Sequence, residues 1–470
     1  MRPLRVAPSA LAVGSVSPAA QPARARAARA LKPLAFGLVA TLVVYMAVPL
    51  DIFSVDKGPA FAPNPLSKAI KLALLVIGAI TIYTRLALAK RVLGKLNRFF
   101  AAFVLLVPAS YLWSISRSDT IGRYMSILTV VAVCLAFCVL SWDARHFQRA
   151  LRPTVTLIVV GSIVFAMISP DLAISHGRGV VFDAWHGLLV QKNSFGQLAS
   201  LGVILWLHAW LAREASAWKA LLFGGASAVC VVLSRSSTSL IATALVIAFL
   251  FLLMRSPSGL KRYLPYIIGI FALTVVAYAI AILDIVPGLN ILLKPIELIT
   301  GKDATFSDRT VIWEIIKEHI ALSPYLGTGY GAYWVGPDPR SPSFAFLGRM
   351  YFYPAESHNG YLEVVNDLGY FGLACLLGYL LVYIRQCLQL WRIDRVQSCL
   401  FLGLFFAQAI ENLSESNWFQ VNSAFIFVIM TLATFAQARM LLEYDTIRQT
   451  APSAAPVQPR FVRASRNFSR

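Results

Sequence analysis

The sequence predicts an all-α polytopic membrane protein with about 12 transmembrane helices and one large, partly helical extramembrane loop. Three observations carry this prediction: 58% of the 470 residues are hydrophobic, only 14% are charged, and long apolar windows recur along almost the whole chain. Each window has the roughly 17–25 residues that a helix needs to cross a bilayer. A composition this apolar excludes an ordinary soluble domain.

The apolar windows divide the chain into five parts. Residues 1–32 are rich in Ala, Pro, Ser and Arg and predict a disordered basic tail, and residues 439–470 predict a second tail. Between them we expect helices 1–9 within 33–286, the large loop at 287–360, and helices 10–12 within 361–438. The predicted spans are 33–50, 69–89, 98–114, 122–141, 153–169, 194–212, 217–233, 237–254, 263–286, 361–384, 397–413 and 419–438.

The distribution of basic residues predicts the orientation. Twelve spans place both tails on one side of the membrane, where 28 of the 42 Lys and Arg residues fall, against 14 on the side of the large loop. Basic residues collect on the cytoplasmic side of membrane proteins, so we expect cytoplasmic tails and an outer loop. The net charge of +20 therefore reflects topology. Outside the apolar windows no basic stretch carries interleaved aromatics, so the sequence gives no support for nucleic acid as a partner, and we expect none.

The six cysteines predict no disulfide framework and no metal site. All of them fall in or beside apolar windows, and none lies in the large loop. Cys134 and Cys138 share a helix face, but no histidine or second cysteine pair joins them, so we interpret them as packing residues.

The residue pattern of the large loop predicts that part of it is ordered. At roughly 74 residues, a connection of this length is usually functional or disordered. Within 307–322, apolar residues recur at helical spacing with charged residues opposite, and Ser307 or Asp308 is a plausible N-cap. The apolar positions are Ile312, Trp313, Ile315, Ile316 and Ile320, and the opposite charges are Glu314, Lys317 and Glu318.

Two arginines on the outer side are candidates for binding an anionic group. Arg235 lies in a tight turn between two spans, although an arginine that only sets topology would favour the inner side. Arg309 opens the predicted loop helix, where the first-turn amides and a guanidinium together suit phosphate. The alternative for Arg309 is a surface salt bridge with Asp308 or Glu314.

His358 is the strongest single candidate for proton chemistry. It lies where the loop meets the membrane, with Glu356, Asn359 and Gly360 close by in the sequence. A histidine can shuttle a proton near neutral pH, and a carboxylate can orient its ring. The alternative is a structural role for this segment, with Ser357 or Asn359 capping the next span.

Several other patterns carry less weight. The run Gly327-Thr328-Gly329-Tyr330-Gly331 lacks the strand and the Lys-Ser/Thr of a nucleotide site. Glu356, Glu363 and Asp367 have the ligand chemistry of a divalent-cation site, but nothing in the sequence fixes their geometry. The serine-rich run 234–239 lacks the strand–turn–helix setting of a hydrolase nucleophile.

Five motifs in order resemble the O-antigen ligase and O-antigen polymerase superfamily of bacterial inner-membrane glycosyltransferases, closest to its exopolysaccharide polymerase branch. The resemblance covers about 190–375 by motif and the rest by hydropathy alone. The motifs are Gln191-Lys192-Asn193-Ser194-Phe195-Gly196, Ser234-Arg235-Ser236-Ser237-Thr238-Ser239, Ser307-Asp308-Arg309-Thr310-Val311-Ile312-Trp313, Pro324-Tyr325-Leu326-Gly327-Thr328-Gly329-Tyr330-Gly331 and Ser357-His358-Asn359-Gly360-Tyr361-Leu362-Glu363.

The resemblance implies a metal-independent, inverting glycosyl transfer on the periplasmic face, with no cofactor. The donor would be a glycan on a polyprenyl (undecaprenyl) pyrophosphate. Arg235 and Arg309 would bind and neutralise the pyrophosphate, and His358 would orient or deprotonate the acceptor hydroxyl. Lys192, Asn193, Asn359 and Glu356 are the further candidates for binding pyrophosphate or glycan.

The acceptor decides between functions. A polymerase joins one lipid-linked repeat unit to another, whereas a ligase passes the glycan to lipid A–core. The motifs at 191–196 and 234–239 resemble those of the polymerase more closely. A non-enzymatic transporter or flippase is the alternative of another class, although paired, broken helices at matching positions in two halves are not evident. The expected partners are the lipid-linked oligosaccharide, the bilayer, and chain-length regulator and flippase proteins.

Overall fold

The computed structural model describes most of the chain. The described residues are 20–50, 65–176, 183–255, six positions between 263 and 273, 307–336, 339, 341–350, 353–421 and 425–450, with side chains from residue 30 onward except those of 307, 308 and 450. The predicted span 263–286 and the loop residues 287–306 fall largely outside this set.

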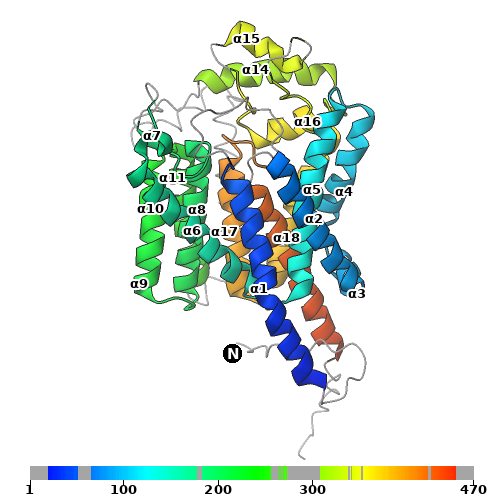
Figure 1. Ribbon diagram of the computed structural model, residues 1–470, viewed down its shortest axis with the longest axis vertical. Helices are drawn as coiled ribbons and strands as arrows, with labels where there is room; N and C mark the ends of the chain where they lie inside the picture. The colour runs from blue at the N-terminus through cyan, green and yellow to red at the C-terminus, as the bar shows by residue number, and fades with distance from the viewer. Residues whose placement is uncertain are drawn as a thin grey trace, which may run out of the picture.

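Long apolar helices make up the body of the protein and confirm an all-α polytopic membrane protein (Figure 1). Within the described residues, eight helices are long and apolar enough to cross a membrane. They are α1 (Ala20–Ala47), α2 (Pro65–Thr84), α5 (Arg117–Leu140), α6 (His146–Ile168), α8 (Lys192–Leu211), α11 (Ser237–Arg255), α16 (Gly360–Trp391) and α18 (Phe425–Thr450).

The predicted count of 12 spans is not confirmed, because several apolar windows form bent or short helices. The helices α3 (Leu86–Leu93) and α4 (Arg98–Ala109), with the turn that follows α4, meet at 105° and raise the count to nine if they form one span. The window 217–233 forms α9 (Ala217–Lys219), a π-helical turn and α10 (Gly225–Leu233), and α17 (Arg395–Glu411) has 17 residues. Hydropathy registers the composition of a window but not where its helix breaks.

The tails and the last span also differ in detail from their predicted bounds. Helix α1 begins at Ala20, inside the segment assigned to the N-terminal tail, and α18 continues to Thr450. Helix α18 begins at Phe425, although the predicted span starts at 419.

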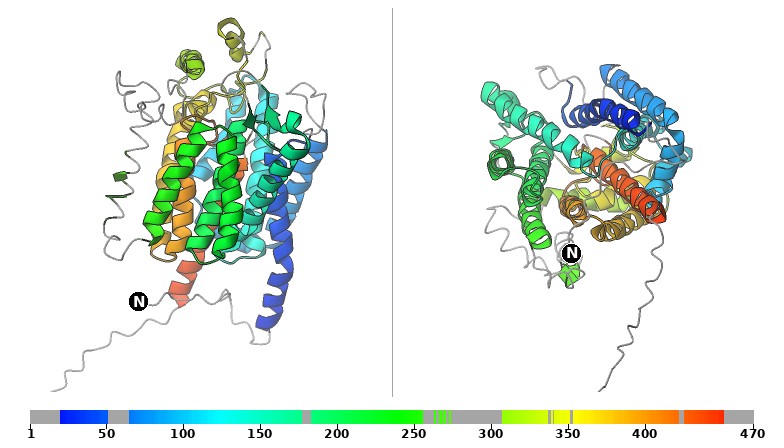
Figure 2. Two further views of the ribbon diagram at one scale, coloured as in Figure 1. Left: turned by 90° about the vertical axis from the view of Figure 1, so that its left-hand side faces the viewer. Right: turned by 90° about the horizontal axis from the view of Figure 1, so that it is seen from below.

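Helix α18 lies at the centre of the bundle, whereas α2 lies at its edge. Within the apolar windows, 94% of the α18 residues are buried but only 17% of those of α2. Seen from below, α18 is surrounded by other helices (Figure 2). A helix that is apolar on all sides needs such surroundings, or lipid, and α18 obtains them from protein.

One end of the bundle carries the described part of the large loop (Figure 1). Here α14 (Ser307–Leu322) packs over the start of α16, and α15 (Ala345–Arg349) packs on α14. The predicted apolar face of α14 is confirmed. Its buried residues are Ile312, Trp313, Ile315 and Ile316, which form a small core with Tyr333, Trp334 and Phe346.

The glycine-rich run is a structural insertion into α16. At Gly369 the helix is broken (φ +61°, ψ −159°), and the loop before α15 occupies the break. The backbone amides of Thr328 and Gly329 donate to the carbonyls of Asn366 and Asp367. A Cβ at Gly329 would lie 2.5 Å from Ser114, so the glycine is needed for close packing.

Among the described residues, the strands are a two-residue antiparallel pair, β1 (Ile174–Ser175) with β2 (Ala184–Trp185), of which β1 follows the short helix α7 (Pro170–Ala173). All six cysteines lie among the described residues, and their thiols are free.

Candidate active site

His358 lies in a strained turn directly before α16. Its φ is +52°, a left-handed conformation that costs a residue with a Cβ about 1 kcal/mol or more. The following residue, Asn359, is the N-cap: its Oδ1 accepts from the amides of Tyr361 and Leu362 at 3.0 and 3.1 Å. Ser357 fixes the other side, because its amide donates to Glu363 at 2.8 Å. The turn is therefore held by hydrogen bonds on both sides of the histidine.

A second loop, 412–418, lies against this turn. The Oδ1 of Asn412 accepts from the amides of Asn417 and Trp418, which folds the loop back on itself. The amide of Gly360 donates to the carbonyl of Asn412 at 2.9 Å, and a Cβ at Gly360 would lie 2.0 Å from the Asn412 Oδ1. Only glycine allows the two loops to approach this closely, and the approach brings Glu415 to His358.

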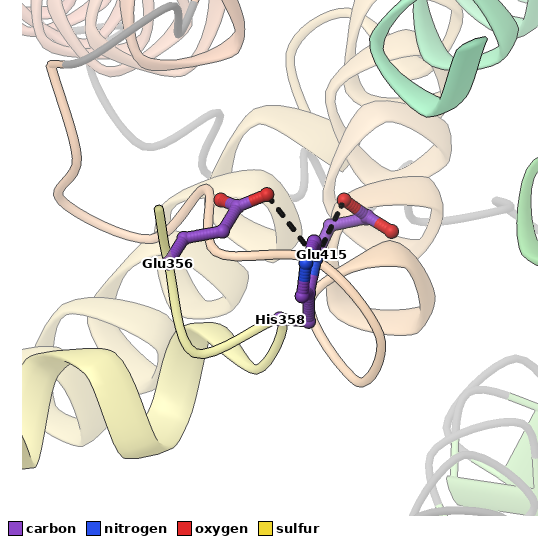
Figure 3. Close-up of side chains that lie close together, drawn as sticks. All are labelled: Glu356, His358 and Glu415. Carbon is purple, nitrogen blue, oxygen red and sulfur yellow. Dashed lines mark ion pairs between the residues drawn. The ribbon is translucent and has the colours of Figure 1, made fainter. Parts of the chain in front are cut away.

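His358 lies between two carboxylates (Figure 3). Its Nδ1 is 3.2 Å from Oε1 of Glu356 and 3.6 Å from Oε2 of Glu415. The side chain of Glu415 is only 8% exposed, and those of His358 and Glu356 are 20% and 25% exposed. Interactions between charges in such a partly desolvated site are screened far less than at the surface.

The two carboxylates determine the charge of His358. Burial alone lowers the pKa of this imidazole, but Glu356 and then Glu415 outweigh it and raise the pKa to about 9. Burial likewise raises the pKa of Glu415, yet Arg309 and His358 bring it below its ordinary value. At neutral pH the site therefore contains an imidazolium and an ionised Glu415.

Two helix N-termini converge on Glu415. Arg309, in the first turn of α14, donates from Nη2 to Oε1 of Glu415 at 2.7 Å. Asn193, in the first turn of α8, donates from Nδ2 to the same oxygen at 2.7 Å. The ion-pair partner that the structure shows for Arg309 is thus 106 residues distant along the chain, and the side chain of Asp308, one of the neighbours weighed from the sequence, lies outside the described residues.

Arg235 and Lys192 lie on elements adjoining this cluster. Arg235 is exposed, has a φ of +49°, and occupies the turn between α10 and α11. That turn packs on the Glu415 loop through a 2.7 Å hydrogen bond from Ser414 to Thr238. Lys192 is half-buried and immediately precedes Asn193 at the start of α8.

Comparisons with known proteins match this site region. Residues 220–377 match the family model described as O-antigen ligase. The chain is also 25% identical, over 74% of its length and 80% of the relative's, to the exopolysaccharide production protein ExoQ of Rhizobium meliloti (strain 1021). The resemblance to the O-antigen ligase superfamily is confirmed. The matches support a membrane protein with a function of the polysaccharide polymerase or ligase type.

The O-antigen ligase match covers part of the cluster. It includes Arg235, Arg309, Glu356 and His358, but it ends before Glu415. Glu415 was not identified from the sequence, because this residue lies in a short connection after an apolar span and outside the five motifs. The available signal was an acidic pair, Glu411 and Glu415, at the loop-side end of that span.

The cluster also contains the ligand atoms of a possible cation site. Atoms of Glu356, His358 and Glu415 lie within 4.8 Å of one another. A divalent ion does not fit well there, because Oε1 of Glu415 already accepts from Arg309 and Asn193, and a guanidinium next to the ion would repel it. The divalent-cation site weighed from the sequence consisted of Glu356, Glu363 and Asp367, and the structure uses two of these carboxylates differently. Glu363 accepts a hydrogen bond from Trp334, and Asp367 accepts one from Gln420.

Proposed function

We propose that this protein is a polymerase of lipid-linked polysaccharide repeat units in exopolysaccharide biosynthesis. It would act in the bacterial inner membrane, with both termini in the cytoplasm and the site on the periplasmic face. The observation that carries the proposal is the cluster of Arg309, His358, Glu356 and Glu415 at the junction of loop and membrane helices. Such a cluster can bind an anionic leaving group and accept one proton. The reaction requires both, because pyrophosphate leaves and the acceptor hydroxyl loses its proton.

The donor is a glycan on a polyprenyl pyrophosphate. Arg309 and Arg235 bind the pyrophosphate, with Lys192 as a further cation on the α8 side. The N-termini of α8 and α14 both face Glu415, and helix N-termini attract anions through their free amides and dipole. The cations neutralise the charge that develops on the pyrophosphate as it leaves.

The transfer is an inverting displacement at the anomeric carbon. A hydroxyl oxygen of the acceptor sugar forms the new glycosidic bond while the bond from that carbon to the pyrophosphate oxygen breaks. The bonding electron pair leaves with the polyprenyl pyrophosphate. Glu356 accepts the hydroxyl proton, since it is the more exposed carboxylate and Glu415 is bound to Arg309. His358, as an imidazolium, orients Glu356 and adds positive charge near the leaving group.

The reaction requires no metal ion in this proposal. Arg309 occupies the position beside Glu415 where a divalent cation would be needed. Activity of the purified protein should therefore persist in EDTA, and a loss that Mg²⁺ or Mn²⁺ restores would contradict this part of the proposal.

A ligase that transfers glycan to lipid A–core is the second candidate, and the family description as O-antigen ligase favours it. The relative named for exopolysaccharide production favours the polymerase. A non-enzymatic transporter or flippase is the candidate of another class, but it would not need a buried cluster of two carboxylates, a histidine and an arginine.

The test is glycan analysis in a host lacking its own copy of the protein. We expect His358→Ala and Arg309→Ala to accumulate single lipid-linked repeat units while both variants insert at normal levels. Loss of secreted polymer identifies a polymerase, and loss of glycan-capped lipopolysaccharide identifies a ligase. If glycan length is unchanged without His358, the catalytic assignment is wrong. Repeat units trapped on the cytoplasmic side would identify a flippase.

A further inference from the structure

A basic cavity lies at the end of the bundle opposite the His358 cluster. It has a volume of about 690 Å³ and is formed by the α3–α4 turn and the C-terminal ends of α16 and α18. Figure 1 shows α3 and the end of α18 far from α14 and α15. The cavity is therefore separate from the proposed transfer site.

Four basic side chains line the cavity, against one carboxylate. They are Lys95, Arg385, Arg392 and Arg448. Lys95 is paired with Asp445 at 2.5 Å. In the part of the chain that the structure describes, the other three guanidiniums have no carboxylate partner, so the cavity holds an excess of about three positive charges.

A buried hydrogen-bond acceptor, the side-chain oxygen of Gln386, indicates that the ligand carries a hydrogen-bond donor. Gln386 lines the cavity and is only 7% exposed. Its Nε2 donates to the carbonyl of Lys95 at 3.0 Å, but its Oε1 accepts no hydrogen bond from any described residue. A buried carbonyl oxygen without a hydrogen-bond donor is costly to the folded state, so a ligand carrying a hydroxyl donor would stabilise it.

The cavity also has an apolar wall. The apolar residues of this wall come from the C-terminal halves of α16 and α18 and from the connection after α16. They are Val382, Leu388, Ile393 and Leu441. Cationic groups beside apolar side chains at the end of membrane helices match the two halves of a phospholipid.

We propose that this cavity binds a phosphate ester, specifically the headgroup of an anionic phospholipid such as phosphatidylglycerol. The phosphate lies among Arg385, Arg392 and Arg448, where guanidiniums offer paired N–H donors to its oxygens. A glycerol hydroxyl donates to the Oε1 of Gln386. The acyl chains follow the apolar wall into the bilayer. The site does not depend on the proposed transferase activity.

Native mass spectrometry of the full-length protein tests this assignment. The detergent-solubilised protein is titrated with phosphatidylglycerol, phosphatidylcholine or soluble glycerol phosphate. The detergent is then removed in the mass spectrometer, and the ligand that stays bound to the protein is counted. The test variant is Arg385→Gln/Arg392→Gln/Arg448→Gln. The matched control, Arg149→Gln/Arg213→Gln/Lys219→Gln, removes three exposed cations from the same end of the bundle but outside the cavity.

We expect one tightly retained phosphatidylglycerol in the wild type and in the control, and no comparable retention of phosphatidylcholine. The test variant should bind at least about tenfold more weakly, since each cation near a lipid phosphate contributes about 1 kcal/mol, or roughly fivefold. Equal weakening in the control, or equal retention of both lipids, would contradict the site. Tighter binding of glycerol phosphate than of phosphatidylglycerol would identify a site for a soluble anion.

Two further measurements keep the test decisive if the triple variant does not fold. Binding of phosphatidylglycerol to the wild type should weaken as salt rises, and salt-independent binding would contradict an ionic site. Gln386→Met should reduce retention of phosphatidylglycerol more than that of phosphatidic acid, which lacks the glycerol hydroxyl. An equal reduction, or none, would overturn the role of Gln386.

Discussion

Glu415 is the residue that joins the separate parts of the site. It contacts Arg309 from α14, Asn193 from α8 and His358 from the turn before α16. Because it is buried among these partners, its charge fixes the geometry of all three. Its position is therefore as important to the proposed chemistry as that of His358.

Glu415→Gln should abolish transfer and destabilise the protein. Removing one partner of a buried ion pair costs about 3–5 kcal/mol, because Arg309 and His358 would be left near a neutral side chain. Thermal unfolding in detergent and assay of polymer formation measure both effects. Glu318→Gln is the control, since its pair with Arg349 is 61% and 48% exposed and contributes at most about 1 kcal/mol. Normal activity in Glu415→Gln would contradict the role assigned to Glu415.

The pKa of His358 makes stability depend on pH. Because that pKa is raised from 6.5 to about 9, the folded state holds the proton more tightly than the unfolded state. The stabilisation is complete below pH 6.5 and is lost as pH rises through about 9; its upper limit is about 3 kcal/mol.

Melting temperatures of the wild type and His358→Gln, measured from about pH 6 to about pH 10, check this dependence. The advantage of the wild type should shrink toward the alkaline end. Transfer activity should fall there too, because the imidazolium is the active form. An advantage or an activity that grows through pH 9 would show that neutral His358 is the working species.

At the scale of elements, the break in α16 positions the loop beneath the site. The break at Gly369 exposes carbonyls that accept from the glycine-rich run, and Trp334, just after this run, donates to Glu363 at 2.7 Å. Glu363 in turn accepts from Ser357, next to His358. The glycine-rich run thus supports the turn that carries His358 through a chain of hydrogen bonds.

Gly369→Ala should disturb this support. The substitution forces a φ of +61° on alanine and places its Cβ 2.2 Å from the carbonyl of Tyr325. We expect a loss of at least about 2 kcal/mol of stability and reduced activity. Gly122→Ala, in α5, is the matched control, because nothing lies within 4 Å of its Cβ. If both variants melt alike, the break in α16 has no such role.

The sequence predicts elements well where composition or spacing determines them. The apolar face of α14 follows from the spacing of its isoleucines, and the interior helices follow from hydropathy. The break at Gly369 does not, because backbone amides of the glycine-rich run donate to carbonyls at the break. The bend between α3 and α4 does not either, because hydrogen bonds from the side chains of Asn97 and Gln386 join this bend to α16. The same reason applies to Glu415, whose contact with Arg309 spans 106 residues and depends on two loops meeting at Gly360.

At the scale of the whole molecule, the two ends of the bundle have different chemistry. One end carries the buried cluster of His358 and Glu415, and the other carries the basic cavity and most cations. This asymmetry agrees with the positive-inside distribution of the sequence and predicts that the His358 end faces the periplasm.

Cysteine labelling in intact cells tests this orientation. In a background with Cys375→Ala, the other native cysteines are buried. An impermeant maleimide should label Glu318→Cys without permeabilisation, and Arg149→Cys only after it. The reverse pattern would place the site in the cytoplasm and contradict the proposed periplasmic reaction.

Reconstitution of the purified protein tests the central claim most directly. In liposomes containing only polyprenyl-pyrophosphate-linked repeat units, the account predicts that glycan length increases and that one polyprenyl pyrophosphate is released for each bond formed. His358→Ala and Arg309→Ala should form no product although they fold and insert. Polymerisation by either variant at the wild-type rate, or no elongation by the wild-type protein, would contradict the account.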